Sequence, residues 1–334
     1  MKTPLIVYFY QKPRSVHNFS IHSLFEYIQA GLPATVQHLQ RISRYESKGF
    51  FPRLYNVIEA SFRQGDINHI VGDVHFLALG LQKKKTVLTI HDVGFMKHPN
   101  KWARQLLYLF WLKLPVERVA VVTVISSETK KEVLKYLPQC PQEKIRIVPN
   151  FISEKFAYVP KPLNKEQPVV LIIGTAFNKN IEHSIKALSG VKCKLTIIGK
   201  LSDAHLQLLQ EHHINYTNRY NVPVDEVVQL YRDCDVLLFA SFLEGFGLPI
   251  LEAQATGRPV ITSNCSSMPE VGGDAAHYVD PYDIASIKEG LQKVLGDESY
   301  YNSLVQKGMV NASRFTRDAT VNGYMQVYRE LLKE

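Results

Sequence analysis

Cysteine is scarce in this chain and is not arranged for metal binding or cross-linking. The 334 residues include four cysteines, and none forms a CxxC pair. Neither a disulfide framework nor a cysteine-ligated metal is expected from such spacing, which is typical of a reducing cytoplasm. We therefore expect a cytoplasmic protein.

Long apolar runs and nucleic-acid-binding patterns are also missing. No stretch is long and apolar enough to span a bilayer. The N-terminal segment MKTPLIVYFYQKP has only a short apolar run, which predicts a first strand rather than a signal peptide. Zinc-finger, RNP and helix-turn-helix patterns are absent, so we expect no nucleic acid as a partner.

Acidic residues are outnumbered by basic ones. Asp and Glu total 31 against 39 Lys and Arg, which gives a net charge of +8 and a pI of about 9.1. This balance favours anionic partners such as nucleotide phosphates or an anionic membrane surface. The length and the hydrophobic fraction of 46% are sufficient for two α/β domains.

One stretch carries the strongest pattern. Val236–Phe239 is a continuous apolar run, typical of a strand buried on both faces of a parallel sheet. After a glycine-bearing loop, Pro249 fits the first position of a helix, which Gly257 ends. Val260–Thr262 is predicted as the next strand. The unit is thus strand, loop, helix, strand.

The loop in this unit combines backbone donors with two carboxylates. Phe246, Gly247 and Leu248 place N–H groups at the start of the helix, a ready site for phosphate oxygens. Glu244 precedes the helix, and Glu252 lies one turn inside it. Taken alone, Glu244 could be a solvated loop residue, and Glu252 could simply complement the helix dipole. Beside a diphosphate, the pair makes sense if one binds hydroxyls of a sugar and the other a ribose.

Glu244, seven residues and Glu252, within EGFGLPILEAQATGRPVI, resemble the signature of the family 4 retaining glycosyltransferases. The resemblance continues in PEVGGDAA and VDPYD downstream, and in LIIGTAFNKNIE and LTIIGK upstream. It is strongest over residues 169–295. It implies an α/β protein of the GT-B fold, in which two Rossmann-like domains face each other across a cleft and a C-terminal helix crosses back to the first domain.

A break in composition marks the expected domain boundary. VPNF at 148–151 resembles the family's entry to its interdomain linker, and a proline-bearing segment follows. We expect an acceptor-side domain over residues 1–155, a donor-binding domain over 156–316, and a final helix over about 317–334 that belongs to the first domain.

The first domain has an unusual loop after its first strand. The family's loop here is usually glycine-rich, but residues 11–18 contain no glycine. Lys12 or Arg14 would then supply phosphate or acceptor contacts through their side chains, or the loop is simply exposed and basic; the sequence leaves both open. Ser126, which also follows a predicted strand, is a further candidate contact.

His91 follows the predicted strand Thr86–Ile90 at its carboxyl end, the edge where open α/β sheets bind ligands. TIHD also matches the family pattern, in which this histidine faces the donor sugar. In the second domain, Lys179 of GTAFNKN resembles the lysine that binds the donor diphosphate. The family's arginine near Thr175 is missing.

The resemblance implies transfer of a sugar from a nucleotide diphosphate donor to an acceptor hydroxyl, with retention. Glu244, His91 and Lys179 are then the catalytic residues. The leaving phosphate oxygen takes the acceptor's proton, so no protein base is required. The expected donor-binding residues are Gly174, Thr175, Lys179, Lys200, Phe246, Gly247, Leu248 and Glu252.

Two other functions remain open, a GT-B-fold nucleotide-sugar epimerase and a catalytically silent nucleotide-binding protein. The expected partners of the transferase are a nucleotide diphosphate sugar and a glycan or lipid-linked glycan acceptor, as in surface polysaccharide or glycolipid assembly. No cofactor is expected. Asp233 and Asp235 spell the DxD of metal-dependent glycosyltransferases, but they precede the strand at Val236 and so lie at the edge opposite the ligands. We predict no metal.

The segment 97–115 is dense in aromatic and basic residues at helical spacing. One interpretation is a helix at the inner face of an anionic membrane or beside a lipid-linked acceptor. The other is an amphipathic helix that buries Trp102, Phe110 and Trp111 in the core. The first predicts peripheral, salt-sensitive binding through Lys97, Lys101, Arg104 and Lys113.

Overall fold

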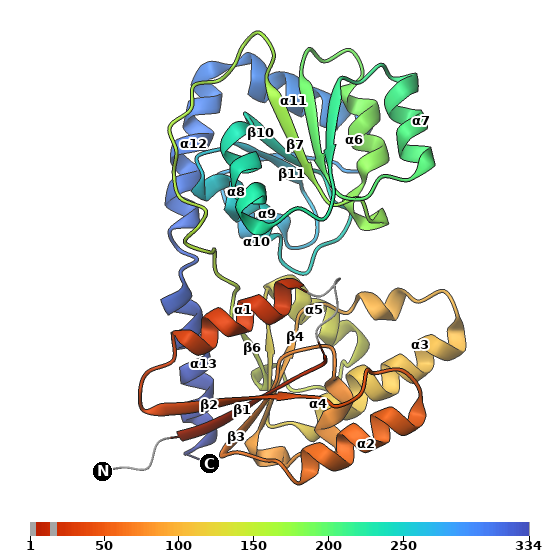
Figure 1. Ribbon diagram of the computed structural model, residues 1–334, viewed down its shortest axis with the longest axis vertical. Coiled ribbons are helices and arrows are strands. Elements are labelled where there is room, and N and C mark those ends of the chain that lie inside the picture. Colours follow the sequence, from red (N-terminus) through yellow and green to blue (C-terminus); the bar gives the residue numbers. More distant parts are fainter. Residues whose placement is uncertain (1–4, 14–18, 334) are drawn as a thin grey trace. The chain divides into compact units, whose positions relative to one another are not determined.

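The computed structural model describes residues 5–13 and 19–333, so Arg14 lies outside the described residues. The chain forms two compact units (Figure 1). Unit 1 comprises residues 1–150 and 317–334, and unit 2 comprises residues 151–316. The expected boundary at 155/156 differs from this division by five residues.

Unit 1 contains a parallel six-stranded sheet in the order β2-β1-β3-β4-β5-β6. Its strands are β1 (Leu5–Gln11), β2 (Val36–Ile42), β3 (Ile67–Ile70), β4 (Thr86–Ile90), β5 (Val121–Val124) and β6 (Ile145–Ile147). Its helices are α1 (Phe19–Ala30), α2 (Phe50–Ser61), α3 (Lys101–Leu107), α4 (Leu114–Arg118), α5 (Ser127–Tyr136) and α13 (Arg317–Leu331). Short 3-10 turns are η1 (His75–Leu79), η2 (Lys83–Lys85), η3 (Gly94–Lys97) and η5 (Gln142–Lys144).

Unit 2 contains a second parallel six-stranded sheet, ordered β12-β11-β10-β7-β8-β9. Its strands are β7 (Val169–Ile173), β8 (Lys194–Ile198), β9 (Tyr216–Arg219), β10 (Val236–Phe239), β11 (Val260–Ser263) and β12 (His277–Val279). Its helices are α6 (Ile181–Leu188), α7 (Asp203–Glu211), α8 (Val224–Asp233), α9 (Leu248–Ala255), α10 (Met268–Gly272), α11 (Ile284–Gly296) and α12 (Glu298–Ala312), with a 3-10 turn η6 (Phe177–Lys179).

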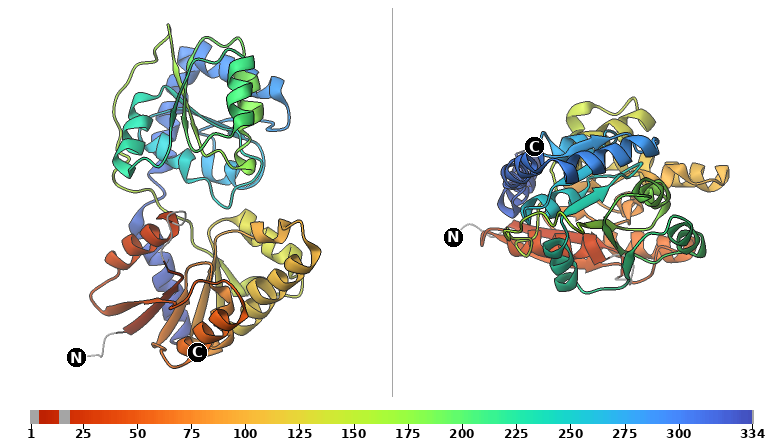
Figure 2. Two further views of the ribbon diagram at one scale, coloured as in Figure 1. Left: turned by 45° about the vertical axis from the view of Figure 1, so that its right-hand side comes forward. Right: turned by 90° about the horizontal axis from the view of Figure 1, so that it is seen from above.

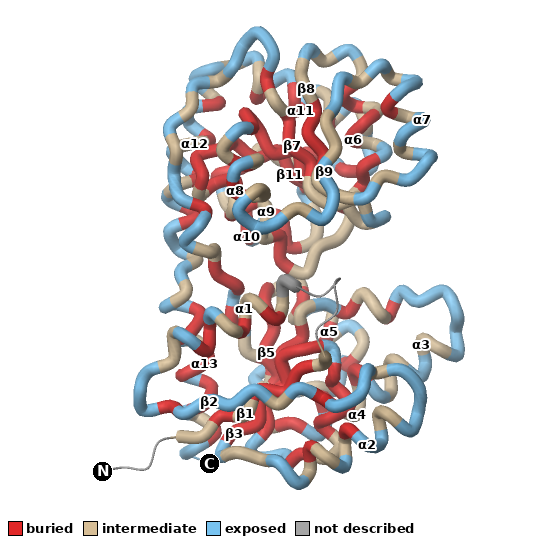
Figure 3. The backbone as a smooth tube through the Cα atoms, in the orientation of Figure 1, coloured by how far each residue is buried: buried red, intermediate tan, exposed pale blue. Residues whose placement is uncertain are grey.

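The central strands are buried because their sequences are apolar on both faces. β10 is buried at all four positions, and the three central residues of β7 are buried as well. Helices cover both faces of each sheet, which is why these strands do not alternate between apolar and polar residues (Figures 1 and 2). Figure 3 shows the resulting buried strands at the centre of each unit.

Each sheet has a point where the strand order reverses direction. In unit 2, counted from its first strand, the order is 3-2-1-4-5-6, and the reversal lies between β7 and β10. In unit 1 it lies between β1 and β3. Loops leaving the two strands at such a point diverge to opposite faces and leave a crevice, where α/β proteins bind their ligands.

The C-terminal helix α13 packs in unit 1, as the family resemblance implied. Tyr328 Oη lies 2.7 Å from His69 Nδ1 on β3, and Thr320 Oγ1 donates to the carbonyl of Pro149. These contacts tie the end of the chain to the first sheet.

The segment 97–115 is not one regular helix. Between α3 and α4, the residues Tyr108–Lys113 form a π-helical turn, η4. Pro115 has no N–H, so it cannot bond the carbonyl of Trp111 four residues earlier. Instead the ring of His75 donates to that carbonyl across 2.6 Å. A side chain that enters the backbone ladder in this way distorts a helix.

Candidate active site

Lys179 and Glu244 meet at the strand reversal of unit 2. Lys179 lies at the end of the loop after β7, and Glu244 lies in the loop after β10. The Lys179 Nζ donates to Glu244 Oε1 across 2.7 Å, and both side chains are largely buried. The ammonium also lies 4.8 Å from the centre of the Phe239 ring. The pair is therefore a fixed cation and a fixed carboxylate at the carboxyl edge of the sheet.

Gly174 makes room for the lysine. Its φ of 89° lies in the left-handed region that glycine adopts without strain. A Cβ at this position would lie 2.9 Å from Lys179 Cγ, because the lysine stem crosses the glycine. Gly174 is therefore a positioning residue for Lys179, a role different from the donor contact predicted for it.

Three residues that the sequence analysis did not select hold the Glu244 loop. The amide of Asn178 donates to the carbonyl of Leu243 and lies 3.4 Å from Glu244 Oε1. Ser266 Oγ accepts from Glu244 N and lies 2.8 Å from Glu244 O. Ser267 Oγ donates to Phe246 O across 2.7 Å. Polar residues in loops are common, so nothing in the sequence distinguished these three.

The start of α9 follows directly. Gly247 has a φ of 109°, and Leu248 begins the helix with proline in its first turn. Phe246 is buried, with its ring 5.9 Å from that of Phe315. The first N–H groups of a helix have no partner within it and carry partial positive charge. They lie in the same loop as Glu244, so this region suits an anionic group.

Glu252 lies inside α9 and has an unusual ionisation. Burial raises its pKa to about 7, and the hydrogen bond from Tyr231 and the nearby Lys179 oppose that rise. Tyr231 Oη donates to Glu252 Oε2 across 2.6 Å. The buried Arg258 donates from Nε to the carbonyl of Tyr231 and so anchors that tyrosine. Glu252 is thus positioned as a hydrogen-bond acceptor whose charge changes near neutral pH.

Thr175 and Lys200 lie on the neighbouring strand ends. Thr175 Oγ1 donates to the carbonyl of Lys200 across 2.7 Å, which joins the loop after β7 to the turn after β8. The Lys200 side chain is exposed. A cavity of about 410 Å³ in unit 2 is lined by Thr175 but by neither Lys179 nor Glu244. Direct donor contacts of Thr175 and Lys200 stay predictions.

The two aspartates of the DxD sequence have partners within unit 2. Asp235 is fully buried before β10; its carboxylate accepts from Lys161 Nζ, from Asn164 N and, across 2.7 Å, from Val169 N. Asp233 accepts from Gln229. Asp235 therefore fastens the segment before β7 to the start of β10. Among the described residues, no group of three or more His, Cys, Asp or Glu side chains is placed to hold a metal ion.

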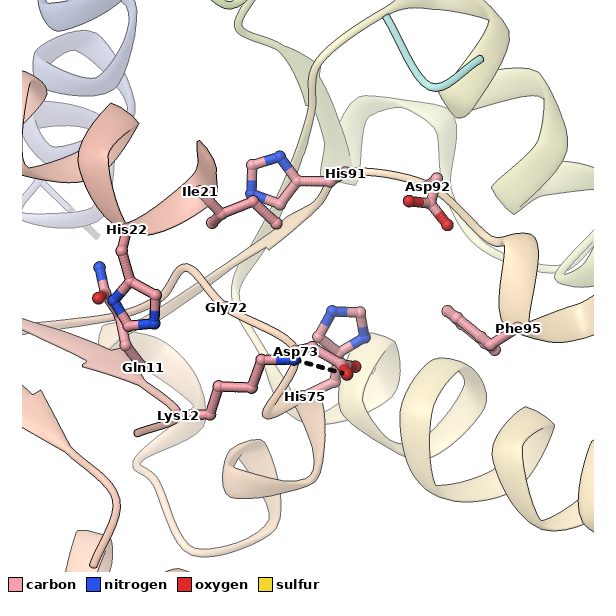
Figure 4. Close-up of a pocket in the computed structure, with 10 residues that line it drawn as sticks. All are labelled: Gln11, Lys12, Ile21, His22, Gly72, Asp73, His75, His91, Asp92 and Phe95. Atoms are coloured by element: carbon pink, nitrogen blue, oxygen red, sulfur yellow. Dashed lines mark hydrogen bonds and ion pairs between the residues drawn. The ribbon is translucent and has the colours of Figure 1, made fainter. Parts of the chain in front are cut away.

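In unit 1, a pocket of about 260 Å³ lies at the strand reversal (Figure 4). It joins residues that follow β1, β3 and β4 and brings together Lys12 and His91, two of the predicted site residues. The lining residues are Gln11, Lys12, Ile21, His22, Gly72, Asp73, His75, His91, Asp92 and Phe95.

The His91 ring is neutral at physiological pH. Burial lowers its pKa to about 4. Its Nε2 lies 3.1 Å from the carbonyl of Val71, an acceptor, so this nitrogen carries the proton. In the neutral tautomer Nδ1 is then the acceptor. His91 is therefore suited to a hydroxyl donor rather than to a phosphate anion.

Lys12 and Gln11 add polar groups to the same pocket. Lys12 Nζ lies 3.5 Å from Asp73 Oδ2, and the other oxygen of Asp73 accepts from Trp111 Nε1 across 2.7 Å. Lys12 is thus paired within the pocket rather than exposed in a loop. The Gln11 side chain is buried, and its Nε2 finds no hydrogen-bond partner among the described residues, 5–13 and 19–333. A buried amide without a partner favours a ligand acceptor at that point.

Ser126 has a structural role in this chain. It is fully buried, and its Oγ accepts from the N–H of Thr129 as the N-cap of α5. It does not line the pocket of unit 1. Its proposed contact with phosphate or acceptor stays a prediction.

Two six-stranded parallel sheets of the Rossmann-like type, one in each unit, are the architecture of the GT-B class. Two family models match consecutive parts of the chain, "Glycosyltransferase Family 4" over residues 19–156 and "Glycosyl transferases group 1" over residues 155–309. The chain belongs to the group 1 glycosyltransferases of the GT-B fold, and its first half matches the family 4 model.

Curated relatives include O-antigen chain mannosyltransferases. One from Escherichia coli is 27% identical over 270 residues, which cover 72% of this chain and 70% of the relative. RfbU of Salmonella typhimurium is 27% identical over 63% of this chain and 61% of its own length. The serotype-specific mannosyltransferase WbdA of Escherichia coli is 25% identical over 65% of this chain, and that alignment covers 29% of WbdA.

Solved structures share the fold over nearly the whole chain. Sucrose-phosphate synthase from Thermosynechococcus elongatus has a TM-score of 0.76 at 16% identity, covering 98% of this chain and 99% of its own. Anabaena HepE, solved with UDP and glucose, has a TM-score of 0.74 at 13% identity, covering 99% and 100%. None of the helices in the described residues combines the length and apolar character needed to cross a membrane.

Proposed function

We propose that this protein transfers a sugar from a nucleoside diphosphate sugar to a hydroxyl of a glycan or lipid-linked glycan, with retention and without a metal. The contact between Lys179 and Glu244 at the strand reversal carries the proposal. The names of the O-antigen mannosyltransferase relatives support a role in surface polysaccharide or glycolipid assembly.

The donor's diphosphate is assigned to Lys179 and the start of α9. An ammonium has three N–H donors, so one bond to Glu244 leaves two for phosphate oxygens. The N–H groups of Gly247 and Leu248 add donors from the backbone. Because Lys179 offsets the charge of Glu244, the carboxylate does not repel the diphosphate strongly. The solved complex of HepE with UDP supports a nucleoside diphosphate ligand for this fold.

The two glutamates have different partners in the donor. Glu244 accepts hydroxyls of the transferred sugar, and Glu252 accepts those of the ribose. In unit 1, the neutral His91 offers Nδ1 to a sugar hydroxyl, and Gln11 offers an amide that no residue in the described part of the chain binds. That pocket therefore fits an uncharged saccharide better than a phosphate.

In the reaction, the bond from the anomeric carbon to the phosphate oxygen breaks as the bond to the acceptor oxygen forms on the same face. The acceptor's proton passes to the departing phosphate oxygen. Lys179 and the N–H groups stabilise the charge that develops there, a contribution that is commonly the largest in such reactions. The Asp235 carboxylate already accepts hydrogen bonds from Lys161 and from backbone N–H groups. This supports a mechanism that does not use the DxD sequence.

The first experiment is a thermal-shift panel of nucleoside diphosphates and their sugars. A ligand at ~100 times its dissociation constant stabilises the fold by about 2.7 kcal/mol. The donor selected is then incubated with and without saccharide acceptors, and the anomeric configuration of the product is read by NMR. An inverted product contradicts retention. Conversion of the donor sugar without acceptor favours an epimerase, and binding without any turnover favours a silent nucleotide-binding protein.

A further inference from the structure

Helix α2 exposes most of its large apolar side chains to solvent. Phe50 and Phe51 are 71% and 79% exposed, and Phe62, which follows the helix directly, is 84% exposed. Together with Leu54, Tyr55 and Ile58, which are also exposed, they fall on one side of the helical projection. We call these six residues the α2 face. Figure 3 shows the exposed turns of this helix.

The opposite side of α2, which packs on unit 1, combines polar side chains with two modest apolar ones, Val57 and Ala60. Asn56 is buried and bonds both the N–H and the carbonyl of Tyr45. Arg53 donates to the carbonyl of Ser47 and lies with its guanidinium 4.7 Å from the Trp111 ring centre. A surface helix normally buries its apolar stripe and exposes its polar one. In α2 the larger apolar side chains lie on the exposed side instead, which marks an interaction surface.

Basic residues outnumber acidic ones in the segments in and beside α2. Apart from the inward-facing Arg53, residues 44–66 and 83–85 contain six Lys or Arg and three Asp or Glu. Two of those acids are already paired, Glu46 with Lys48 and Glu59 with Arg63. The run Lys83–Lys85 is exposed and lies beside the end of α2, because the N–H of Gln82 donates to the Gln64 side chain there. The charge complements an anionic surface.

Aromatic and basic residues combined on one helix fit a lipid headgroup layer. Phenylalanine and leucine enter the boundary between headgroups and acyl chains, while lysine and arginine contact the lipid phosphates. A purely apolar protein partner would not require the excess of positive charge. We propose that the α2 face docks this protein reversibly on an anionic lipid surface. The proposal does not depend on the transferase activity.

Helix α3 bears on the same question. Trp102 is 83% exposed, and Leu106 and Phe110, one and two turns further along, are also exposed. Burial of Trp102 and Phe110 in the core, one of the two interpretations of the segment 97–115, is therefore wrong; only Trp111 is buried. The basic residues of α3 remain candidates, but α2 has the larger apolar face, so we assign the docking surface to α2.

The test is co-sedimentation with vesicles of phosphatidylcholine alone or mixed with phosphatidylglycerol. We expect wild-type protein to bind only the anionic vesicles and to dissociate as salt is added. Phe51→Ser combined with Phe62→Ser should weaken binding by at least about tenfold, because each removes a large apolar group from the interface. Both side chains are mostly exposed, so the melting temperature should not change.

The matched control is Val310→Ser, which removes an apolar side chain that is 70% exposed on α12 of unit 2. It should bind vesicles as wild type does. Replacing Lys83, Lys84 and Lys85 by glutamine should weaken binding at low salt and flatten its salt dependence, without changing the melting temperature.

Three outcomes overturn the proposal. The first is wild-type protein that stays in the supernatant with anionic vesicles at low salt. The second is unchanged binding by the Phe51 and Phe62 double variant, with loss of binding by Trp102→Ser, which would move the surface to α3. The third is a wild-type dimer on size exclusion that the double variant converts to monomer while neither binds vesicles, which would assign the α2 face to a second copy of the chain.

Discussion

The raised pKa of Glu252 makes nucleotide binding depend on pH. With a pKa of about 7, about half of these carboxyl groups are ionised at pH 7, and about one in ten at pH 6. Ribose hydroxyls donate hydrogen bonds, which an ionised carboxylate accepts more strongly than a carboxylic acid does. If only the ionised form binds, the dissociation constant of a nucleoside diphosphate rises about tenfold from pH 8 to pH 6.

A rise in pH that strengthens nucleotide binding lowers the stability of the free protein. The folded-state pKa of Glu252 lies above its ordinary value of 4.5, so the folded protein holds this proton more tightly than the unfolded chain does. Without nucleotide, stability due to this group is fully present below about pH 4.5 and is lost as the pH rises through about 7. With nucleotide bound, the ribose hydroxyls donate to the carboxylate, so less stability is lost as the pH rises.

Tyr231→Phe tests the cause of this pKa. The hydroxyl bonds the carboxylate across 2.6 Å and lowers the pKa against the effect of burial. A hydrogen bond to a charged group contributes ~1.5–3 kcal/mol, and ~1.4 kcal/mol equals one pKa unit. The variant should therefore raise the pKa by about one unit or more. At pH 7 the affinity for a nucleoside diphosphate should fall about fivefold.

The assay is isothermal titration calorimetry with a nucleoside diphosphate between pH 6 and pH 8, in buffers of different ionisation heat. The wild-type protein should release a proton on binding near pH 7. The nucleotide's own phosphate titrates near pH 6, so Glu252→Gln is the control that retains only that contribution. The reasoning is refuted if wild type and Glu252→Gln share one pH dependence, or if Tyr231→Phe reproduces the wild-type curve.

Further predictions concern the same site. Lys179→Ala should weaken nucleoside diphosphate binding and slow transfer by ~10²–10³, and unchanged turnover and donor affinity would contradict its assignment. Gly174→Ala should raise the donor's Michaelis constant and lower the melting temperature, because the left-handed backbone costs an alanine about 1–2 kcal/mol and its Cβ displaces the lysine; wild-type kinetics would show that the glycine does not position it. Glu244→Gln should mainly lower turnover, whereas Glu252→Gln should raise the Michaelis constant; identical profiles would show that the division of roles is wrong. Activity should persist in excess EDTA, and a loss that manganese or magnesium restores would disprove metal independence.

Local patterns in the sequence were sufficient to predict most of the helices and strands. The strand at Thr86–Ile90 was predicted at its observed position, and α9 begins at Leu248, one residue before the predicted start at Pro249, because apolar runs, proline and glycine act within a few residues. The predicted strands also gave the candidate site residues, because parallel strands in one sheet have their carboxyl ends at the same edge. That argument placed Lys12 and His91 in what proved to be one pocket.

Contacts between distant segments were decided by the tertiary structure. Lys179 and Glu244 are 65 residues apart, and no local pattern shows that they bond to each other rather than to ligands. The pKa of Glu252 depends on burial and on Tyr231, which lies on another helix. At the π-helical turn before Pro115, the side chain of His75 on η1 bonds the carbonyl of Trp111, which the proline has no N–H to bond.

Helix α2 shows the limit of sequence periodicity most clearly. Its apolar residues recur at helical spacing, which predicts one apolar side and one polar side. Periodicity does not tell which side faces the core, because that depends on what the rest of the fold places against the helix. Here the backbone of residues 45–47 and the ring of Trp111 receive the polar side. The apolar side is left to the solvent, so the sequence determined the stripe and the tertiary structure determined its direction.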